Sequence, residues 1–148
     1  MPTLPDELSH LDADTARDLF HEAASHAFNS IMVTTADQAG NGEIVFVNDA
    51  FTEMTGYPEE EVLGETPGLM QGPKTDEGEL ERLASDLADG KVFQGETVNY
   101  KKDGSEFIIE WKVAPVHAEN GEVTHYVAVQ RDVTALREAG VPSADAAA

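Results

Sequence analysis

Hydrophobic and polar positions along the chain follow first a helical period and then a strand period. From Asp14 onward, apolar residues recur at helical spacing and predict an N-terminal helix whose stripe is Ala16, Leu19, Phe20, Ala23, Ala24 and Ala27. Residues 30–36 (SIMVTTA) and 43–48 (EIVFVN) are instead rich in β-branched residues, which are typical of strands. The Asn41-Gly42 pair between them is a hairpin turn signal. We therefore predict a helix followed by a two-stranded hairpin.

Caps and breakers predict several helices in the next section of the chain. Asn48 is positioned to cap a helix over 49–55, and a second short helix over 58–63 begins at a proline and ends before a glycine. A longer helix follows Thr75, its predicted N-cap, and stops at residues 89–90. Its predicted core-facing residues are Leu80, Leu83, Ala84 and Leu87.

The remaining pattern is strand, turn, strand, turn, strand. The predicted strands are 92–101, 105–116 and 122–133, joined by Asp-Gly and Asn-Gly turns. Two strands, several short helices and three more strands indicate an α+β domain. In it, a five-stranded antiparallel sheet carries short helices on one face that cup a ligand pocket. The predicted boundaries are a tail and capping helix over 1–27, a core domain over 28–134 and a linker or tail over 135–148.

Strand alternation identifies one face of the sheet that must be covered. On 105–116, one face carries Phe107, Ile109, Trp111 and Val113. On the two neighbouring strands neither face is wholly apolar, and Asn99 and Gln130 meet the covered face if they point inward. An unpaired buried amide costs about 1–3 kcal/mol, so each bonds to backbone or to the other, or binds a ligand. Together with Gln71, these amides suit the edge of a planar heterocycle that displays both donors and acceptors.

Composition restricts the class of protein. The chain has 148 residues, which is typical of one domain, and its hydrophobic content of 41% is enough for a packed core. It has no cysteine, which excludes disulfides, thiolate nucleophiles and cysteine-bound metals. No apolar run has the length of a membrane span, and the acidic N-terminus does not resemble a signal peptide. We expect a cytoplasmic protein.

Charge is strongly asymmetric, with 9 basic against 29 acidic residues and a net charge of −20. Such a surface repels phosphate backbones, so we expect no nucleic-acid partner. The excess of acidic residues serves either general solubility or adaptation to high salt. We favour a halophilic interpretation because salt screens the repulsion among the acids.

The sequence shows no catalytic or metal-binding pattern. The five histidines lack metal-ligand spacing; His21 and His26, five residues apart, do not share a helical face. The acidic run 59–61 is typical of a solvated helix face, and no glycine-rich phosphate loop or nucleophile motif is present. We expect that the chain is not an enzyme.

Four segments carry a family resemblance: "VNDAFTEMTGYPEEEVLG", "LMQGPKTD", "VNYKKDGSEF" and "VAVQRDVT". They resemble the PAS superfamily and, within it, the light-oxygen-voltage (LOV) flavin photoreceptor domains, over about residues 28 to 134. The resemblance implies a flavin between sheet and helices, with FMN expected and FAD or riboflavin as alternatives. It implies that Gln71 and Asn99 hold the polar edge of the flavin and that Gln130 lies near the reactive ring nitrogen. The implied walls are Val33, Thr35, Met70, Leu80, Leu83, Leu87, Trp111, Val113 and Tyr126.

The chain departs from the LOV pattern at the photoactive cysteine. The family motif is G-x-N-C-R-F-L-Q-G, whereas this chain has "GETPGLMQG", and Pro67 takes the place of the cysteine. Light therefore cannot form the usual flavin–thiol adduct here. Thr66 replaces the preceding asparagine, and as an N-cap followed by Pro67 at the first helical position it still allows a short helix to begin.

Other departures concern the polar partners of the flavin. The two phosphate-binding arginines of the family align with Gly68 and Ala84, and a pocket asparagine aligns with Ile109. Either Lys74 or Arg82 substitutes for the arginines, or the flavin lacks strong phosphate anchoring.

Two functions remain open at this point. The first is a blue-light or redox sensory domain that signals by flavin photoreduction and hydrogen-bond rearrangement, with Trp111 and Tyr126 as candidate electron donors; plain packing is the alternative role for Trp111. The second is a flavin-free PAS module for dimerisation or small-ligand sensing. A homodimer through the N-terminal helix and the exposed sheet face is expected, with an unknown effector domain or partner protein.

Overall fold

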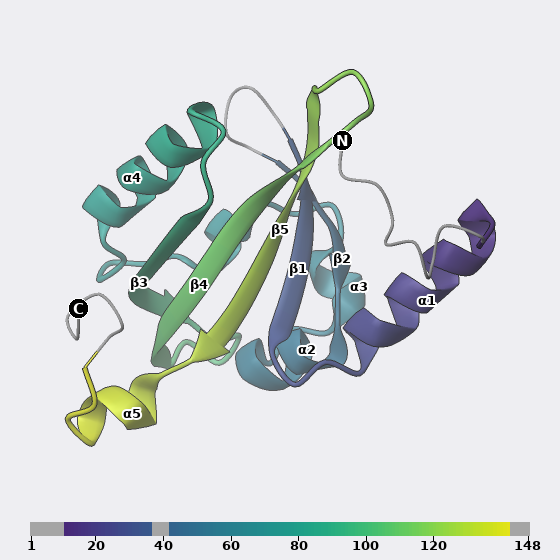
Figure 1. Ribbon diagram of the computed structural model, residues 1–148. Coiled ribbons are helices and arrows are strands. Elements are labelled where there is room, and N and C mark those ends of the chain that lie inside the picture. The colour runs from purple at the N-terminus through teal and green to yellow at the C-terminus, as the bar shows by residue number, and fades with distance from the viewer. Residues whose placement is uncertain (1–10, 37–41, 143–148) are drawn as a thin grey trace.

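The computed structural model describes residues 11–36 and 42–142, and its centre is one antiparallel sheet of five strands (Figure 1). The spatial order is β2-β1-β5-β4-β3, so the last strand of the chain lies beside the first. The predicted α+β fold is confirmed. The strands are β1 (Ser30–Thr35), β2 (Ile44–Val47), β3 (Phe93–Tyr100), β4 (Glu106–His117) and β5 (Val123–Asp132).

Helices connect β2 to β3 and cover one face of the sheet. They are α2 (Asp49–Thr55), α3 (Glu59–Val62), the 3-10 helix η1 (Pro67–Met70) and α4 (Glu77–Ala88). Contacts join α2 to β1 and α4 to β3, so these two helices lie over opposite halves of the sheet (Figure 1). Two helices lie outside this layer: α1 (Ala13–Ser25) precedes β1, and α5 (Thr134–Glu138) follows β5. In the described ranges, no helix combines the length and the apolar character needed to cross a membrane.

Asn48 shows how a cap predicted from sequence also fixes tertiary structure. Its side-chain oxygen accepts from the Phe51 backbone N–H at 3.1 Å, which starts α2, and from the Ile31 N–H at 2.9 Å. Its amide nitrogen donates to the Ala24 carbonyl at 2.7 Å. One buried side chain therefore holds α1, β1 and α2 together.

The start of α4 differs from the prediction by one residue. Its N-cap is Asp76, whose carboxylate accepts from the backbone N–H groups of Gly78 and Glu79. Thr75, predicted as the cap, donates its hydroxyl to the Val98 carbonyl at 2.7 Å instead. The prediction of Thr75 as the cap was wrong because that hydroxyl joins the loop to β3.

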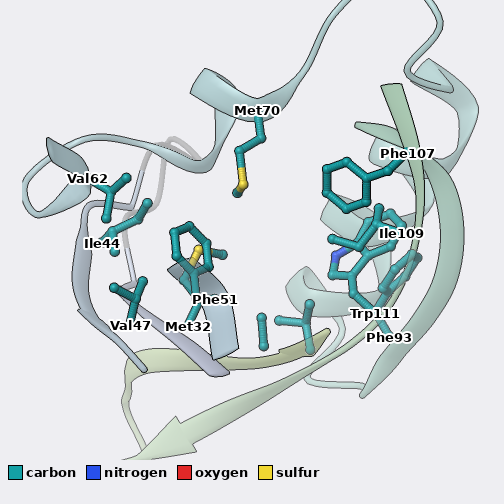
Figure 2. Packing of buried hydrophobic residues seen from close by; sticks show 12 residues of the cluster. Met32, Ile44, Val47, Phe51, Val62, Met70, Phe93, Phe107, Ile109 and Trp111 are labelled. Atoms are coloured by element: carbon teal, nitrogen blue, oxygen red, sulfur yellow. The ribbon is translucent and has the colours of Figure 1, made fainter. Parts of the chain in front are cut away.

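The core consists of two groups of buried side chains (Figure 2). One group lies on the β1–β2 side with α2 and α3, and the other lies on β3 and β4; Met70 from η1 extends between them. The buried cluster comprises Met32, Ile44, Val47, Phe51, Val62, Met70, Phe93, Phe107, Ile109, Trp111, Val113 and Ala128.

The predicted apolar stripe of α1 is not covered by described parts of the chain. Leu19 is 48% exposed and Phe20 55% exposed, and only Ala24 of this helix is buried. The ring of His21 lies edge-on to Phe46 of β2, with centroids 5.8 Å apart. The helix is therefore formed as predicted but presents apolar side chains outward.

Candidate ligand-binding site

The register of the sheet builds the floor of a cavity from two rows of inward side chains. The first row runs across four strands and contains Ser30, Gln130, Trp111 and Gly95. The next row contains Met32, Ala128, Val113 and Phe93. All are buried, and Gln130 lies directly beside Trp111. Five of these residues, Gln130, Trp111, Met32, Ala128 and Val113, line the cavity or its hollow, so this part of the floor is apolar except for one glutamine.

The roof of the cavity is α4, which covers the sheet without packing tightly against it. Its apolar stripe, Leu80, Leu83 and Leu87, turns toward the sheet, yet no residue of this helix is fully buried. The space between holds a cavity of about 560 Å³ and an adjoining hollow of about 60 Å³. Cofactor and small-molecule sites occupy about 300–1,000 Å³, so this cavity is large enough for a planar cofactor.

Amide side chains converge on the smaller hollow. Gln71, Asn99 and Gln130 all line it, from the loop after η1, from β3 and from β5 respectively. The Gln130 side-chain oxygen accepts from the Ser30 hydroxyl at 3.0 Å, and Gln130 is 3% exposed. Asn99 is 9% exposed, and no described residue forms a hydrogen bond with its amide. No described side-chain nitrogen or oxygen is both fully buried and unpaired, so the Asn99 amide keeps access to the hollow and is available to a ligand that enters it.

The loop that carries Gln71 is fixed at both ends. Met70, the last residue of η1, is 1% exposed and anchors the loop in the core. The Gly72 N–H donates to the Thr75 hydroxyl, and a Cβ atom at position 72 would collide with the Tyr100 ring. The Tyr100 hydroxyl in turn accepts from the Lys74 backbone N–H at 3.0 Å. The backbone of this loop therefore holds Gln71 beside the cavity, although its side chain is still exposed.

Comparison with known proteins identifies the fold and its family. The profile of the PAS domain family matches residues 29–135. The chain belongs to the PAS domain family. A solved structure described as that of an RNA-binding light-oxygen-voltage receptor superposes with a TM-score of 0.79 at 31% sequence identity, over 93% of this chain and 38% of that one. The resemblance to PAS and LOV domains predicted from sequence is thereby confirmed.

Curated relatives are sensory and regulatory proteins much longer than this PAS domain. A blue-light-activated histidine kinase of Brucella anthropi is 37% identical over 103 residues, which is 70% of this chain and 21% of the kinase. A bacterioopsin transcriptional activator of Halobacterium salinarum is 34% identical over 128 residues, which is 86% of this chain and 19% of the activator. The PAS domain thus spans about a fifth of the length of these relatives.

Most of the residues predicted as pocket walls line the cavity or its hollow. The large cavity is lined by the predicted residues Thr35, Pro67, Gln71, Leu80, Leu83, Leu87, Trp111, Val113 and Tyr126. The hollow adds the predicted residues Met70, Asn99, Ile109 and Gln130.

Two predicted pocket residues lie elsewhere. Val33 pairs with Val127 and points to the outer face of the sheet, because the inward side chains of β1 are those at positions 30, 32 and 34. Thr66 occupies the predicted N-cap position of η1, but its side chain makes no capping hydrogen bond and is exposed to solvent. The placement of both residues in the pocket wall was wrong.

Sequence reasoning also missed part of the lining. Met32 and Thr34 lie on the floor because β1 alternates with the opposite parity from that implied by Val33, whereas Ala128 shares its face of β5 with the predicted residues Tyr126 and Gln130. Ala88 continues the α4 stripe by one helical turn from Ala84, a spacing visible in the sequence. Gly42 and Thr97 complete the lining; the sequence marks Gly42 only as part of a turn, and Thr97 lies two residues from Asn99 on the same strand.

The described lining contains no acid, no histidine and no cation. The nearest carboxylate with a displaced pKa is Glu79 of α4, which lies in a separate groove; the Arg82 guanidinium hydrogen-bonded to it holds the pKa of that carboxyl below its ordinary value. Tyr126 carries the one ionisable side chain of the described lining. The cavity is therefore suited to holding an aromatic ligand by its faces and one polar edge, and not to general acid–base chemistry.

Proposed function

We propose that this PAS domain is a sensory module that binds a flavin non-covalently and responds to blue light or redox state without a cysteinyl adduct. The observation that carries the proposal is the amide cluster at one end of an apolar cavity, in which the Asn99 amide is accessible from the hollow and forms no hydrogen bond with described residues. The similarity to a blue-light-activated histidine kinase and to a LOV receptor structure supports it.

The residues present fit the ring system of a flavin. Asn99 and Gln71 offer amide donors and acceptors to the pyrimidine edge of the ring, which displays both. Leu80 and Leu83 from α4 would contact one face of the ring, and Val113 from β4 the other. Gln130 would meet the central part of the ring from the sheet.

A bound flavin supplies an excited state that is a strong oxidant, and the chain must supply the electron. Trp111 and Tyr126 are the aromatic donors that line the cavity. Pro67 occupies the position where the family has its cysteine, and the chain has no cysteine at all, so the thiol adduct is not available. The proposed mechanism is therefore electron transfer followed by a change in hydrogen bonding.

In this proposal, Gln130 transmits the change in hydrogen bonding to the sheet. Its side-chain oxygen accepts from the Ser30 hydroxyl, so its amide nitrogen is directed away from Ser30. A serine hydroxyl both donates and accepts, so rotation of the amide by half a turn leaves Gln130 paired with Ser30 while exchanging donor for acceptor at the cavity. The change would pass to β1 and β5, which pair at these two residues.

The test is the visible absorption and emission of the purified full chain in high salt, before and after blue light. We expect a structured blue band with bright emission, reversible bleaching under light and recovery in air. A stable flavin spectrum without photochemistry would contradict the sensing mechanism and leave a flavin-binding domain. A folded preparation with no visible band, even after added flavin, would overturn flavin binding.

A flavin-free PAS module is the second candidate. The replacement of a pocket asparagine by Ile109 and the exposed position of Gln71 favour it, because both weaken the polar edge. In either case we propose a homodimer that passes its signal to an effector domain or partner protein, with no substrate turnover by this chain. A cytoplasmic location and the lack of a nucleic-acid partner stay predictions from sequence.

A further inference from the structure

We propose that the cavity selects a flavin whose side chain carries no phosphate, so that riboflavin binds in preference to FMN or FAD. The inference rests on the proposed flavin function and concerns the end of the cavity away from the amide cluster. Three features support it: the positions of all the cations, the polarity of the lining, and the orientation of α4.

Every lysine and arginine of the chain can be placed, and none lines the described cavity. The sequence has nine lysines and arginines, all of them within the described residues. The segment 37–41, which precedes the lining residue Gly42, reads DQAGN and contains no cation. A phosphate group on a bound flavin would therefore meet no lysine or arginine in the described lining.

Lys74 and Arg82, the two predicted substitutes for the phosphate-binding arginines, point elsewhere. Both line a separate groove of about 630 Å³ along the β3 edge of the sheet. Lys74 pairs with Glu106 at 3.0 Å. Arg82 hydrogen-bonds Glu79 at 2.8 Å and the Gln94 carbonyl at 2.8 Å. These contacts hold both cations outside the flavin cavity.

The part of the cavity not shared with the amide hollow is mostly apolar and uncharged. Thr34 and Tyr126 contribute hydroxyl groups, the Thr35 hydroxyl accepts from the Glu43 backbone N–H, and Gly42, Ala84 and Ala88 leave space between them. Hydroxyls that donate and accept are suitable partners for the hydroxyl groups of a ribityl chain. They do not offer the charge-assisted hydrogen bonds by which proteins bind phosphate.

The orientation of α4 also disfavours a flavin that carries a phosphate. The last turn of α4, with Leu87 and Ala88, lines the cavity, so the carboxyl end of this helix lies beside the same region. That end carries a partial negative charge, and the last turn contains no basic residue to offset it. In a chain of net charge −20, a phosphate dianion at this place would be repelled and not bound.

The test compares the dissociation constants of riboflavin and FMN for the flavin-free full chain, by fluorescence titration at low and high KCl. We expect riboflavin to bind more tightly than FMN at low KCl, and the difference to narrow at high KCl, where the repulsion of the phosphate is screened. Ala84→Arg introduces a cation into the lining, and Ala84→Gln is the matched neutral control. One charge-assisted hydrogen bond should raise the FMN affinity of the arginine variant about tenfold relative to the glutamine variant, with riboflavin affinity equal in the two.

Three results would overturn the inference. Wild-type protein that binds FMN about tenfold more tightly than riboflavin would show that phosphate is anchored, and the flavin function would still stand. A folded Ala84→Arg variant without any gain for FMN would show that a missing cation does not set the preference. Binding of neither flavin would overturn the proposed flavin function itself, and this inference with it.

Discussion

Trp111 combines two roles at one position of the sheet. Its ring lies 4.9 Å from that of Phe93, centroid to centroid, and Gly95 opposite Trp111 on β3 leaves room for the Phe93 ring, which a Cβ atom there would meet. The same side chain lines the cavity and its hollow and is 8% exposed. Packing explains why an aromatic residue is present; only its place in the cavity wall allows electron donation.

Replacing Trp111 by Phe separates the two roles. We expect the initial rate of bleaching under constant blue light to fall at least about threefold, because phenylalanine is a much poorer electron donor. The smaller ring leaves a void, and we expect a loss of about 1–3 kcal/mol in unfolding free energy. Tyr126→Phe, which keeps the ring, is the matched control for the second donor. An unchanged bleaching rate in Trp111→Phe would assign this residue to packing alone.

Replacing Gln130 should separate photochemistry from its effect on the sheet. In Gln130→Leu the Ser30 hydroxyl loses its acceptor in a buried position, which should cost about 1–3 kcal/mol of stability. Photobleaching should persist, because the electron donors are intact, while the light-minus-dark infrared bands of the sheet should be lost. Gln71→Leu, outside the sheet, is the control and should keep those bands. Sheet bands that persist in Gln130→Leu would exclude the amide as the path to β5.

At the scale of elements, α4 is held to the edge of the sheet by polar contacts. Arg82 donates to the Gln94 carbonyl, and the Glu79 carboxylate accepts from the Glu96 backbone N–H at 3.4 Å. The Asp76 backbone N–H donates to the Thr97 hydroxyl at 2.7 Å. The first two bonds occupy backbone groups of the edge strand β3, which would otherwise be open to pairing with another chain. They also hold the helix above the cavity without requiring its apolar stripe to be buried.

Glu79→Gln should weaken this attachment in a pH-dependent way. The Arg82 hydrogen bond lowers the pKa of Glu79 below its ordinary value of 4.5, so the native state favours the ionised carboxylate. The resulting stabilisation is present above pH 4.5 and is lost as the pH falls through the lower native pKa. Because the Arg82 side chain is 42% exposed, the loss at pH 7 should be at most about 1 kcal/mol.

Denaturant unfolding at neutral and acidic pH measures the effect of Glu79→Gln. The variant should be less stable than wild type at pH 7 and equal to it in acid, where Glu79 is protonated in both states. Glu81→Gln, on an exposed position of the same helix, is the control and should show no such difference. A deficit that is the same at both pH values would mean that the carboxylate charge is not what matters.

Helices and turns were predictable from sequence where a few neighbouring residues determine where they begin or end. The Asn48 cap and the turns at 103–104 and 120–121 depend only on residues close in sequence. The structure has both the cap and the left-handed glycines of the two turns. The orientation of β1 was not predictable in this way. Its outward residues Ile31 and Val33 are more apolar than its inward Ser30 and Thr34, so hydrophobicity alone indicates the wrong face. Pairing with β5, a hundred residues away, determines the correct one.

The candidate site was predictable in composition but not in geometry. Strand alternation identified Trp111 and Val113 as inward residues, and the family resemblance identified the three amides. That α4 lies over the sheet without burying its leucines depends on its attachment to β3, which no local pattern contains. The exclusion of Lys74 and Arg82 from the cavity depends on the same edge contacts.

At the scale of the whole molecule, apolar side chains gather on the surface opposite the cavity. Ile31 and Val33 of β1 pair with Val129 and Val127 of β5 on the outer face of the sheet, and Val129 is 38% exposed. Leu19 and Phe20 of the neighbouring α1 are also exposed. Exposed apolar surface of this kind is typical of an interface between proteins, and the proposed occupant is a second copy of the chain.

Leu19→Gln combined with Phe20→Gln should therefore shift the protein from dimer to monomer. Removing two apolar anchors from such an interface typically costs several kcal/mol, which raises a dimer dissociation constant by at least about a hundredfold. Light scattering after size-exclusion chromatography across a range of concentrations measures the change. Asp18→Gln, an exposed residue of the same helix, is the control and should leave the mass unchanged. A wild-type monomer at all concentrations would contradict the proposed dimer.

The net negative charge of the surface affects how the stability of the fold depends on salt. Salt has two opposite effects here, because it weakens the ion pairs and also screens repulsion among the acids. Most described pairs are partly exposed, such as Lys102–Glu61 and Arg17–Asp14, and such pairs contribute only about 0–1 kcal/mol each. With 29 acidic against 9 basic residues, repulsion is the larger effect.

The melting temperature should therefore rise by about 5 °C or more between 0.1 and 2 M KCl, concentrations over which the Debye length falls from about 10 Å to below about 3 Å. Glu59→Gln with Glu60→Gln, both exposed on α3, removes two of the 20 excess negative charges. This variant should be more stable than wild type at low salt and should gain less from KCl, because less repulsion remains to be screened. A melting temperature that falls with KCl would show instead that the ion pairs outweigh the repulsion, and would remove the physical basis for a salt-adapted surface.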